Sequence, residues 1–252
     1  NQREHFLIFA RLHNSPEPAT SEKDFMRCLP DSLDFVSLTN ADNFSKYDAE
    51  DMSVMREKGI KVLYQVDYAG RSEELSDATK LGAYLEQVIA AVAANGLDGY
   101  SFTGIPNASV PARAEAAALI VSKLSAAKTD GQVLVFEGNP LFVADADRAK
   151  VDYFVLDTET TTNATELKLQ VRNATEYAAV PAEKLLLAAA AGAPLNDEES
   201  VEQVAITEMA GRVVSLGPLC GLAAYDIDND YYDLDMNYKV IRNAIQTLNP
   251  SK

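Results

Sequence analysis

The sequence has no tryptophan, and only two cysteines and two histidines among its 252 residues. Cys28 and Cys220 are far apart in the sequence, so they suggest neither a disulfide framework nor a Cys-x-x-Cys metal site. A histidine-based metal site or a Ser-His-Asp triad would have to use His5 or His13, and no pattern around either supports this. We therefore expect no metal and no cofactor.

Positive charge is also scarce, because 22 Lys and Arg stand against 38 Asp and Glu, for a formal net charge of −16. An acidic chain repels phosphate backbones, so we expect no nucleic acid partner. No run approaches the roughly 18 consecutive apolar residues of a transmembrane helix. We expect a monomer, and because the sequence begins at Asn1 without a methionine, we expect that an export signal or lipid anchor has been removed.

Eight short apolar runs are spread along the whole chain, and longer amphipathic segments separate most of them. Each run has the length of a strand and is apolar enough for a parallel strand covered on both faces. The order predicts an α/β fold, a single (β/α)8 TIM barrel, over residues 1–252 as one domain. A doubly wound open sheet is the alternative, although no Gly-x-Gly-x-x-Gly follows any strand. The predicted strands are 5–12, 33–39, 61–68, 99–103, 132–137, 151–157, 184–190 and 221–226.

Six amphipathic segments between or after these strands have helical spacing of their apolar residues. The link 138–150 is short and leaves room for only one or two helical turns. The predicted helices are 48–58, 72–95, 112–127, 165–177, 197–215 and 233–248.

Three strand segments resemble glycoside hydrolase family 18. Residues 97–105 read LDGYSFTGI on the fourth strand, where the family carries D-G-x-D-x-D-x-E, and Asp98 and Gly99 match its first two positions. Residues 151–157 (VDYFVLD) are similar to the sixth strand of the family. Residues 221–228 (GLAAYDID) resemble the eighth strand of its endo-β-N-acetylglucosaminidase branch.

The sequence departs from the family at the positions that carry its chemistry. Ser101, Thr103 and Ile105 replace the three later acidic residues of the motif, and the last of these is the general acid of the family. An isoleucine donates no proton, and loss of a general acid costs about 10²–10⁴ in rate. The resemblance therefore implies no catalytic residue at the usual place, and we expect the chain not to be an enzyme.

The sequence resembles barrels that are related to these endoglycosidases and that bind glycans in bacterial glycan-uptake systems without cleaving them. This resemblance implies a protein exported to the cell surface or periplasm that recognises glycans containing N-acetylglucosamine. It also implies partners of an outer-membrane glycan-uptake system.

In a TIM barrel the ligand lies at the carboxyl ends of the strands. Polar and aromatic side chains at that mouth suit a carbohydrate, whose hydroxyls pair with carboxylates and amides while its apolar ring face lies on an aromatic ring. Arg11, His13, Asn40, Asp67 and Asp228 belong to the predicted mouth. The residues predicted to bind the ligand are Tyr68, Ser101, Thr103, Glu137, Asn139, Asp157, Glu159, Tyr225 and Asp226.

Other interpretations of these residues remain open. Asp157 and Glu159 have the position of helix caps, and they or Glu137 are also candidates for a displaced acid in an active glycosidase. The alternation Asp226, Asp228, Asp230 suggests a Ca²⁺ loop, but the glycine and glutamate of that pattern are absent. A structural component that binds through its outer helices is the third functional hypothesis.

Overall fold

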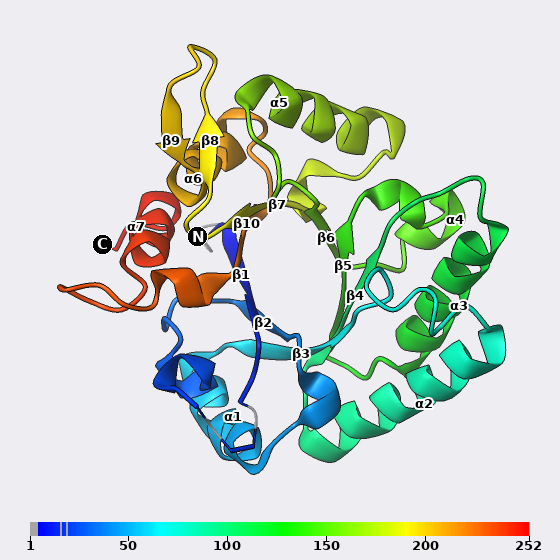
Figure 1. Cartoon of the computed structure of the whole chain (residues 1–252). Helices are drawn as coiled ribbons and strands as arrows, with labels where there is room; N and C mark the ends of the chain where they lie inside the picture. Colours follow the sequence, from blue (N-terminus) through cyan, green and yellow to red (C-terminus); the bar gives the residue numbers. More distant parts are fainter. Residues whose placement is uncertain (1–4, 16, 19, 252) are drawn as a thin grey trace.

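Eight parallel strands close into a barrel in the computed structural model, which describes residues 5–15, 17–18 and 20–251 (Figure 1). Their order around the barrel is β1-β10-β7-β6-β5-β4-β3-β2. This confirms the predicted (β/α)8 barrel, and the open sheet is wrong. All eight predicted strands are present, and their bounds are β1 Leu7–Leu12, β2 Phe35–Leu38, β3 Lys61–Val66, β4 Gly99–Gly104, β5 Val133–Gly138, β6 Tyr153–Leu156, β7 Leu185–Ala190 and β10 Gly221–Tyr225.

Helices surround the barrel on the outside (Figure 1). The α-helices are α1 Lys46–Lys58, α2 Ala78–Asn95, α3 Pro111–Ala127, α4 Asp145–Arg148, α5 Ala164–Arg172, α6 Ala205–Ser215 and α7 Lys239–Leu248. The short predicted link between β5 and β6 holds a 3-10 turn, Pro140–Phe142, and the single turn of α4. Between β1 and β2 the described residues form two 3-10 turns, Glu22–Asp24 and Met26–Cys28, and no α-helix.

Local sequence explains where the first helices begin and end. Ser45 and Asp48 form a reciprocal capping box at the start of α1, and Gly59 ends that helix in the left-handed region. Asp77 accepts hydrogen bonds from the first backbone N–H groups of α2, and Gly96 ends it. Helix α2 therefore begins at its cap, six residues after the predicted start.

The predicted helix 197–215 is wrong over its first eight residues. Two short antiparallel strands, β8 Pro194–Asn196 and β9 Glu202–Val204, form a hairpin there, and α6 follows directly. The carboxylate of Asp197 accepts hydrogen bonds from the backbone N–H groups of Glu199 and Val201. The acid thus closes the hairpin loop and does not cap a helix.

The last helix also begins later than predicted, at Lys239. The residue before it, Tyr238, has a φ of +54°, which helical backbone cannot adopt. Asp230 supplies the cap from outside the helix, because its carboxylate accepts hydrogen bonds from the N–H groups of Val240 and Ile241.

Apolar side chains fill two separate layers. One layer lies between the strands and the helices. The other lies inside the barrel and contains Phe9, Phe35, Leu63, Val135, Val155, Leu186, Ala188, Ala223 and Tyr225. The inner layer fills the barrel below its carboxyl end, and the inward polar side chains of the strands gather above it at the mouth.

The opposite end of the barrel is held by aspartates that precede alternate strands. Each accepts a hydrogen bond of 2.7–2.8 Å from the backbone N–H of the preceding strand: Ile8 to Asp34, Val62 to Asp98, and Leu134 to Asp152. Next to Asp98, Gly99 has a φ of +134°, and a Cβ there would lie 2.1 Å from the carbonyl oxygen of Val133. The Asp98-Gly99 pair therefore has a structural role at the bottom of the barrel.

None of the helices in the described part of the chain combines the length and hydrophobicity needed to cross a bilayer.

Candidate functional site

Polar side chains from six strands meet inside the mouth end of the barrel. Alternation along each strand turns them inward, while their neighbours in sequence pack against the helices. The hydroxyls of Ser37 on β2 and Ser101 on β4 form a hydrogen bond, with 2.6 Å between their Oγ atoms. The set comprises Arg11, Ser37, Gln65, Ser101, Glu137 and Tyr225.

Glu137 lies at the centre of this set, and its side chain is fully buried. One carboxylate oxygen accepts hydrogen bonds from Arg11 Nε at 2.6 Å and from the hydroxyl of Tyr225 at 3.0 Å. The other accepts from Gln65 Nε2 at 2.9 Å and, at 3.5 Å, from the hydroxyl of Ser37. Both oxygens are thus engaged within the protein.

Arg11 covers this carboxylate from the mouth side. Its guanidinium carbon lies 3.6 Å from the centre of the Tyr225 ring, and its side chain is 27% exposed. Burial alone would lower the pKa of Arg11, but the neighbouring acidic groups, Glu137 foremost through its charge and its hydrogen bond, together outweigh burial and the pKa is raised. Burial and the charge of Glu137 raise the pKa of Tyr225. At neutral pH the arginine is therefore charged and the phenol neutral.

Strand β4 places the residues that replace the acidic motif at three depths. Ser101 is fully buried inside the barrel. Thr103 lies at the rim, where its hydroxyl donates to Asp67 at 2.7 Å and accepts from the backbone N–H of Ala69 at 3.0 Å. Ile105 follows the strand with 58% of its surface exposed. No carboxylate is therefore present on β4 where the resemblance places the acid.

Asp157 and Glu159 lie half-buried after the end of β6. Burial raises the pKa of both carboxyls, and for Glu159 the neighbouring charges of Asp157 and Glu137 raise it further while Arg11 opposes them. One oxygen of Glu159 is buried and has no hydrogen-bond partner among the described residues. The alternative that these acids cap the next helix is wrong, because Asn163 caps α5.

The two predicted aromatic ligand contacts are buried in this structure. Tyr68 is 2% exposed and its ring stacks on Phe142, with 5.8 Å between centroids. Tyr225 is 3% exposed and lies under Arg11. Asp226 is exposed at the rim with a φ of +50°. The two tyrosines thus offer almost no surface to a ligand in this structure, as do Ser101 and Glu137.

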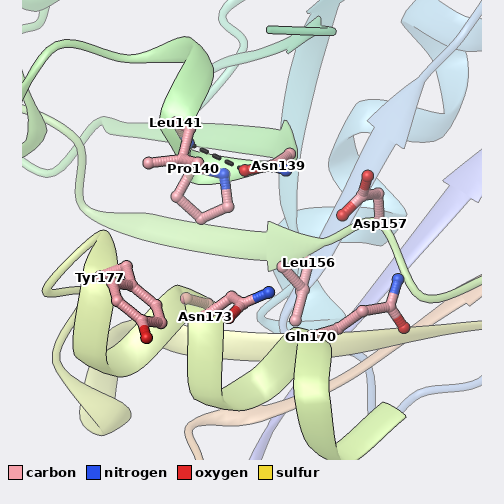
Figure 2. A pocket seen from close by; sticks show the side chains of 9 residues that line it. Asn139, Pro140, Leu141, Leu156, Asp157, Gln170, Asn173 and Tyr177 are labelled. Carbon is pink, nitrogen blue, oxygen red and sulfur yellow. Dashed lines mark hydrogen bonds between the residues drawn. The ribbon is translucent and has the colours of Figure 1, made fainter. Parts of the chain in front are cut away.

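Asn139 and Asp157 also line a pocket of about 350 Å³ between the turn after β5 and helix α5 (Figure 2). The side chain of Asn139 accepts a hydrogen bond from the backbone N–H of Leu141 at 3.0 Å, which fixes its orientation. The structure therefore divides the predicted site into the mouth network around Glu137 and this lateral pocket.

Sequence reasoning missed Ser37 and Gln65, which bind Glu137 from β2 and β3. Each interrupts an otherwise apolar strand at an inward position near its carboxyl end. That interruption is the signal that would have identified them.

The sequence matches no protein-family model and no curated protein. Solved structures do resemble it. A GH18 chitinase from Pseudoalteromonas aurantia has a TM-score of 0.71 at 13% identity, covering 96% of this chain and 100% of that chain. The barrel has the family 18 fold. An endo-β-N-acetylglucosaminidase from Cordyceps militaris has a TM-score of 0.71 at 15% identity, covering 99% of this chain and 92% of that one. A chitinase from Bacteroides thetaiotaomicron has a TM-score of 0.75 at 10% identity, with 97% and 96% covered. At these identities the likeness concerns the fold.

Proposed function

We propose that this family 18-like barrel binds glycans containing N-acetylglucosamine without cleaving them. The observation that carries the proposal is the mouth end of β4, where Thr103 and Ile105 stand in place of the reacting acidic pair. Thr103 is held by Asp67 and a backbone N–H, and Ile105 has no proton to give. The strand thus supplies a polar rim without a general acid.

The remaining mouth residues suit recognition of sugar hydroxyls. Arg11 offers guanidinium donors at the rim, while Asp157 and Glu159 offer carboxylate acceptors beside it. Glu137 is the most buried acid of the mouth, and its hydrogen bonds to four side chains hold the network rigid. Rigid donors and acceptors of this kind reduce the entropy lost when a ligand binds.

Isothermal titration with a high-mannose N-glycan that contains the chitobiose core tests the proposal. We expect heats that saturate and then stop, since binding proceeds without turnover. Asp157→Asn and Glu159→Gln should each weaken binding by about tenfold or more, because each removes a charge-assisted hydrogen bond. Asp130→Asn, at the exposed turn before β5 and at the other end of the barrel, is the matched control. Absence of heat with every N-acetylglucosamine-containing glycan would refute the proposal.

A second candidate function is hydrolysis with Glu159 as a displaced acid. It is favoured by the raised pKa of Glu159, by its buried unpartnered oxygen and by the neighbouring acid Asp157. A carboxyl whose pKa is raised holds its proton to a higher pH than an ordinary glutamate, which suits it to protonate a leaving glycosidic oxygen. Continuing heat in the same titration, with product seen by mass spectrometry and lost in Glu159→Gln, would establish it. The Thr103→Asp, Ile105→Glu double variant asks separately whether the β4 acids alone restore turnover.

Export to the cell surface or periplasm and association with an outer-membrane glycan-uptake system belong to the same proposal. The resemblance to glycan-uptake barrels supports both. Fractionation of cells that produce the full-length protein, followed by affinity purification from the membrane fraction, tests them. Recovery in the cytoplasm alone would contradict this part of the proposal.

A further inference from the structure

A lateral pocket of about 350 Å³ lies beside the mouth, at the carboxyl end of β6 (Figure 2). Its volume is at the small end of the roughly 300–1,000 Å³ typical of ligand pockets, so it suits a single ring better than an extended chain. Asp157 belongs both to this pocket and to the acidic group at the mouth, because its charge acts on Glu159. The pocket and the mouth therefore adjoin.

The outer wall of the pocket is a π-helical turn. Helix α5 ends at Arg172, and the chain continues as the π-helix Asn173–Tyr177, with the N–H of Ala178 bonded to the carbonyl of Asn173 at 3.0 Å. The wider turn places Asn173 and Tyr177 together on the pocket side. Single π-turns within α-helices occur frequently at functional sites.

Arg148 connects the two sides of the pocket, which are the turn after β5 and the π-helix. Its Nε donates to the carbonyl of Pro140 at 3.2 Å, and its Nη1 donates to the carbonyl of Ala178 at 2.8 Å. The first carbonyl belongs to the turn after β5 and the second follows the π-helix. The side chain of Arg148 is 13% exposed, so this bridge is largely protected from water. The pocket is thus a built feature of the fold.

Fixed polar groups point to a hydroxyl-bearing ligand. The amide oxygen of Asn139 accepts from Leu141, and that of Gln170 accepts from the hydroxyl of Thr161 at 2.5 Å. Each oxygen is therefore engaged, and the amide nitrogens of both residues have no partner among the residues that the structure describes. Asp157 supplies a carboxylate acceptor nearby. Two fixed donors and one acceptor around one opening match the hydroxyls of a sugar.

Apolar surface at the same opening complements these groups. Tyr177 is 72% exposed and Leu141 is 52% exposed, and both line the pocket. An exposed tyrosine ring beside amide groups can stack on the apolar face of a pyranose. Because Asp157 lies in the pocket and the chain carries a net charge of −16, an acidic sugar would be repelled.

We propose that this pocket binds one uncharged hexopyranose unit, which is an outer branch of the glycan whose core lies at the barrel mouth. The second half of this proposal rests on the proposed function, whereas the first half does not. Asn139 and Gln170 donate to the hydroxyls of the ring, Asp157 accepts from them, and Tyr177 stacks on its face.

Protein-observed NMR with methyl α-D-mannopyranoside tests the pocket by itself. We expect millimolar sugar to shift the side-chain amide signals of Asn139 and Gln170. Tyr177→Ala should weaken this binding about fivefold to tenfold, and Tyr177→Phe should retain it because the ring remains. Glu176→Gln, on the exposed face of the same π-helix, is the matched control. Unshifted amide signals in the wild type would overturn the proposal, and so would equal shifts in Tyr177→Ala.

Titration with two glycans then tests the link to the mouth. We expect Tyr177→Ala to weaken binding of the branched high-mannose glycan by a similar factor and to leave binding of the chitobiose core unchanged. Equal affinity of wild type and Tyr177→Ala for the branched glycan would overturn the branch assignment while the proposed function stands. Mannoside binding in the pocket without any binding of the N-glycan would instead refute the proposed function and leave the pocket site intact.

Discussion

Glu137 shows what a single buried carboxylate does at the mouth. It joins β5 to β1, β2, β3 and β10 through side-chain hydrogen bonds, so one residue ties five of the eight strands together. Its arginine partner keeps a charge that has lost part of its hydration, since the Arg11 side chain is only 27% exposed. Removing the negative charge leaves that positive charge without its hydrogen-bonded partner, and only the weaker interaction with Glu159 remains.

Glu137→Gln should therefore destabilise the protein. Breaking a buried ion pair costs about 3–5 kcal/mol, and we expect the lower end because Arg11 retains some contact with water. The free energy of unfolding in urea measures the effect. Glu115→Gln on the exposed surface of α3 is the control, with an expected change within about 0.5 kcal/mol. Equal free energies of unfolding for the two variants would show that the ion pair and hydrogen bonds of Glu137 do not stabilise the fold.

Glu159 makes a prediction about pH. Burial raises the pKa of its carboxyl in the folded protein, so the folded state binds the proton more strongly than the unfolded chain does. Stability therefore falls as the pH rises from the ordinary glutamate range, about pH 4, through the raised value. Glu159→Gln carries no charge and escapes this loss, so its stability relative to the wild type should increase between about pH 4 and pH 7. Parallel stability curves across that interval would contradict the prediction.

The residue-level site could be predicted only in part. Strand alternation placed Ser101, Thr103 and Glu137 inside the mouth, because an inward position follows directly from strand register. The side chains that donate hydrogen bonds to the Glu137 carboxylate could not be predicted, since they come from strands up to 126 residues away. Nor could the sequence show that Tyr225 would be covered by Arg11.

At the scale of elements, the start of β4 is fixed by close contact between two backbones. Gly99 has a φ of +134°, and its Cα faces the carbonyl oxygen of Val133 so closely that no Cβ fits. This requirement explains the Asp-Gly pair without reference to catalysis. A sequence motif shared with an enzyme can thus persist for reasons of strand pairing alone.

Gly99→Ala should destabilise the fold strongly. Overpacking and a strained φ each cost about 1–3 kcal/mol, so we expect a loss of roughly 2–6 kcal/mol or failure to fold. Gly211→Ala in α6 is the matched control, because no atom of the described residues outside its own helix backbone lies within 4 Å of the place that a Cβ would take. It should stabilise by about 0.4–1 kcal/mol through the unfolded state. Thermal and urea unfolding of the pair measure both effects, and a fully stable Gly99→Ala would contradict the reasoning.

Strands were predictable as elements, whereas several helix starts were not. Apolar runs identify buried strands directly, and all eight were found. Helix starts depend on caps, and the cap of α7 is Asp230, nine residues before the helix begins. The π-helix Asn173–Tyr177 lies inside a regular amphipathic pattern, so only its tertiary contacts reveal it.

At the scale of the whole molecule, the net charge bears on which glycans suit the proposed function. A net charge of −16 repels acidic glycans at long range and leaves neutral ones unaffected. The fold itself was predictable at this scale because eight strands in succession admit few arrangements. Its use as a binding surface is not set by the barrel, since one fold supports many functions.

A sialylated glycan should therefore bind more weakly than a neutral glycan of the same core. The difference should narrow as salt is raised, because ions screen the charge on the surface. Titrations of both glycans at low and high ionic strength provide the measurement. If the difference in affinity between the two glycans does not change with salt, the weaker binding of the sialylated glycan is due to steric fit and not to charge.

The aspartates at the bottom of the barrel have a consequence for engineering. At the end remote from the mouth, neighbouring strands are joined by the carboxylates of Asp34, Asp98 and Asp152, which accept hydrogen bonds from backbone N–H groups. Because the donors are backbone groups, a substitution on the partner strand leaves these hydrogen bonds in place. Substitutions should therefore be tolerated better at the rim of the mouth than at the aspartates at the bottom of the barrel. Libraries that randomise an exposed rim position such as Ile105 should yield mostly folded proteins, and the scaffold is suited to directed evolution of binding at the mouth.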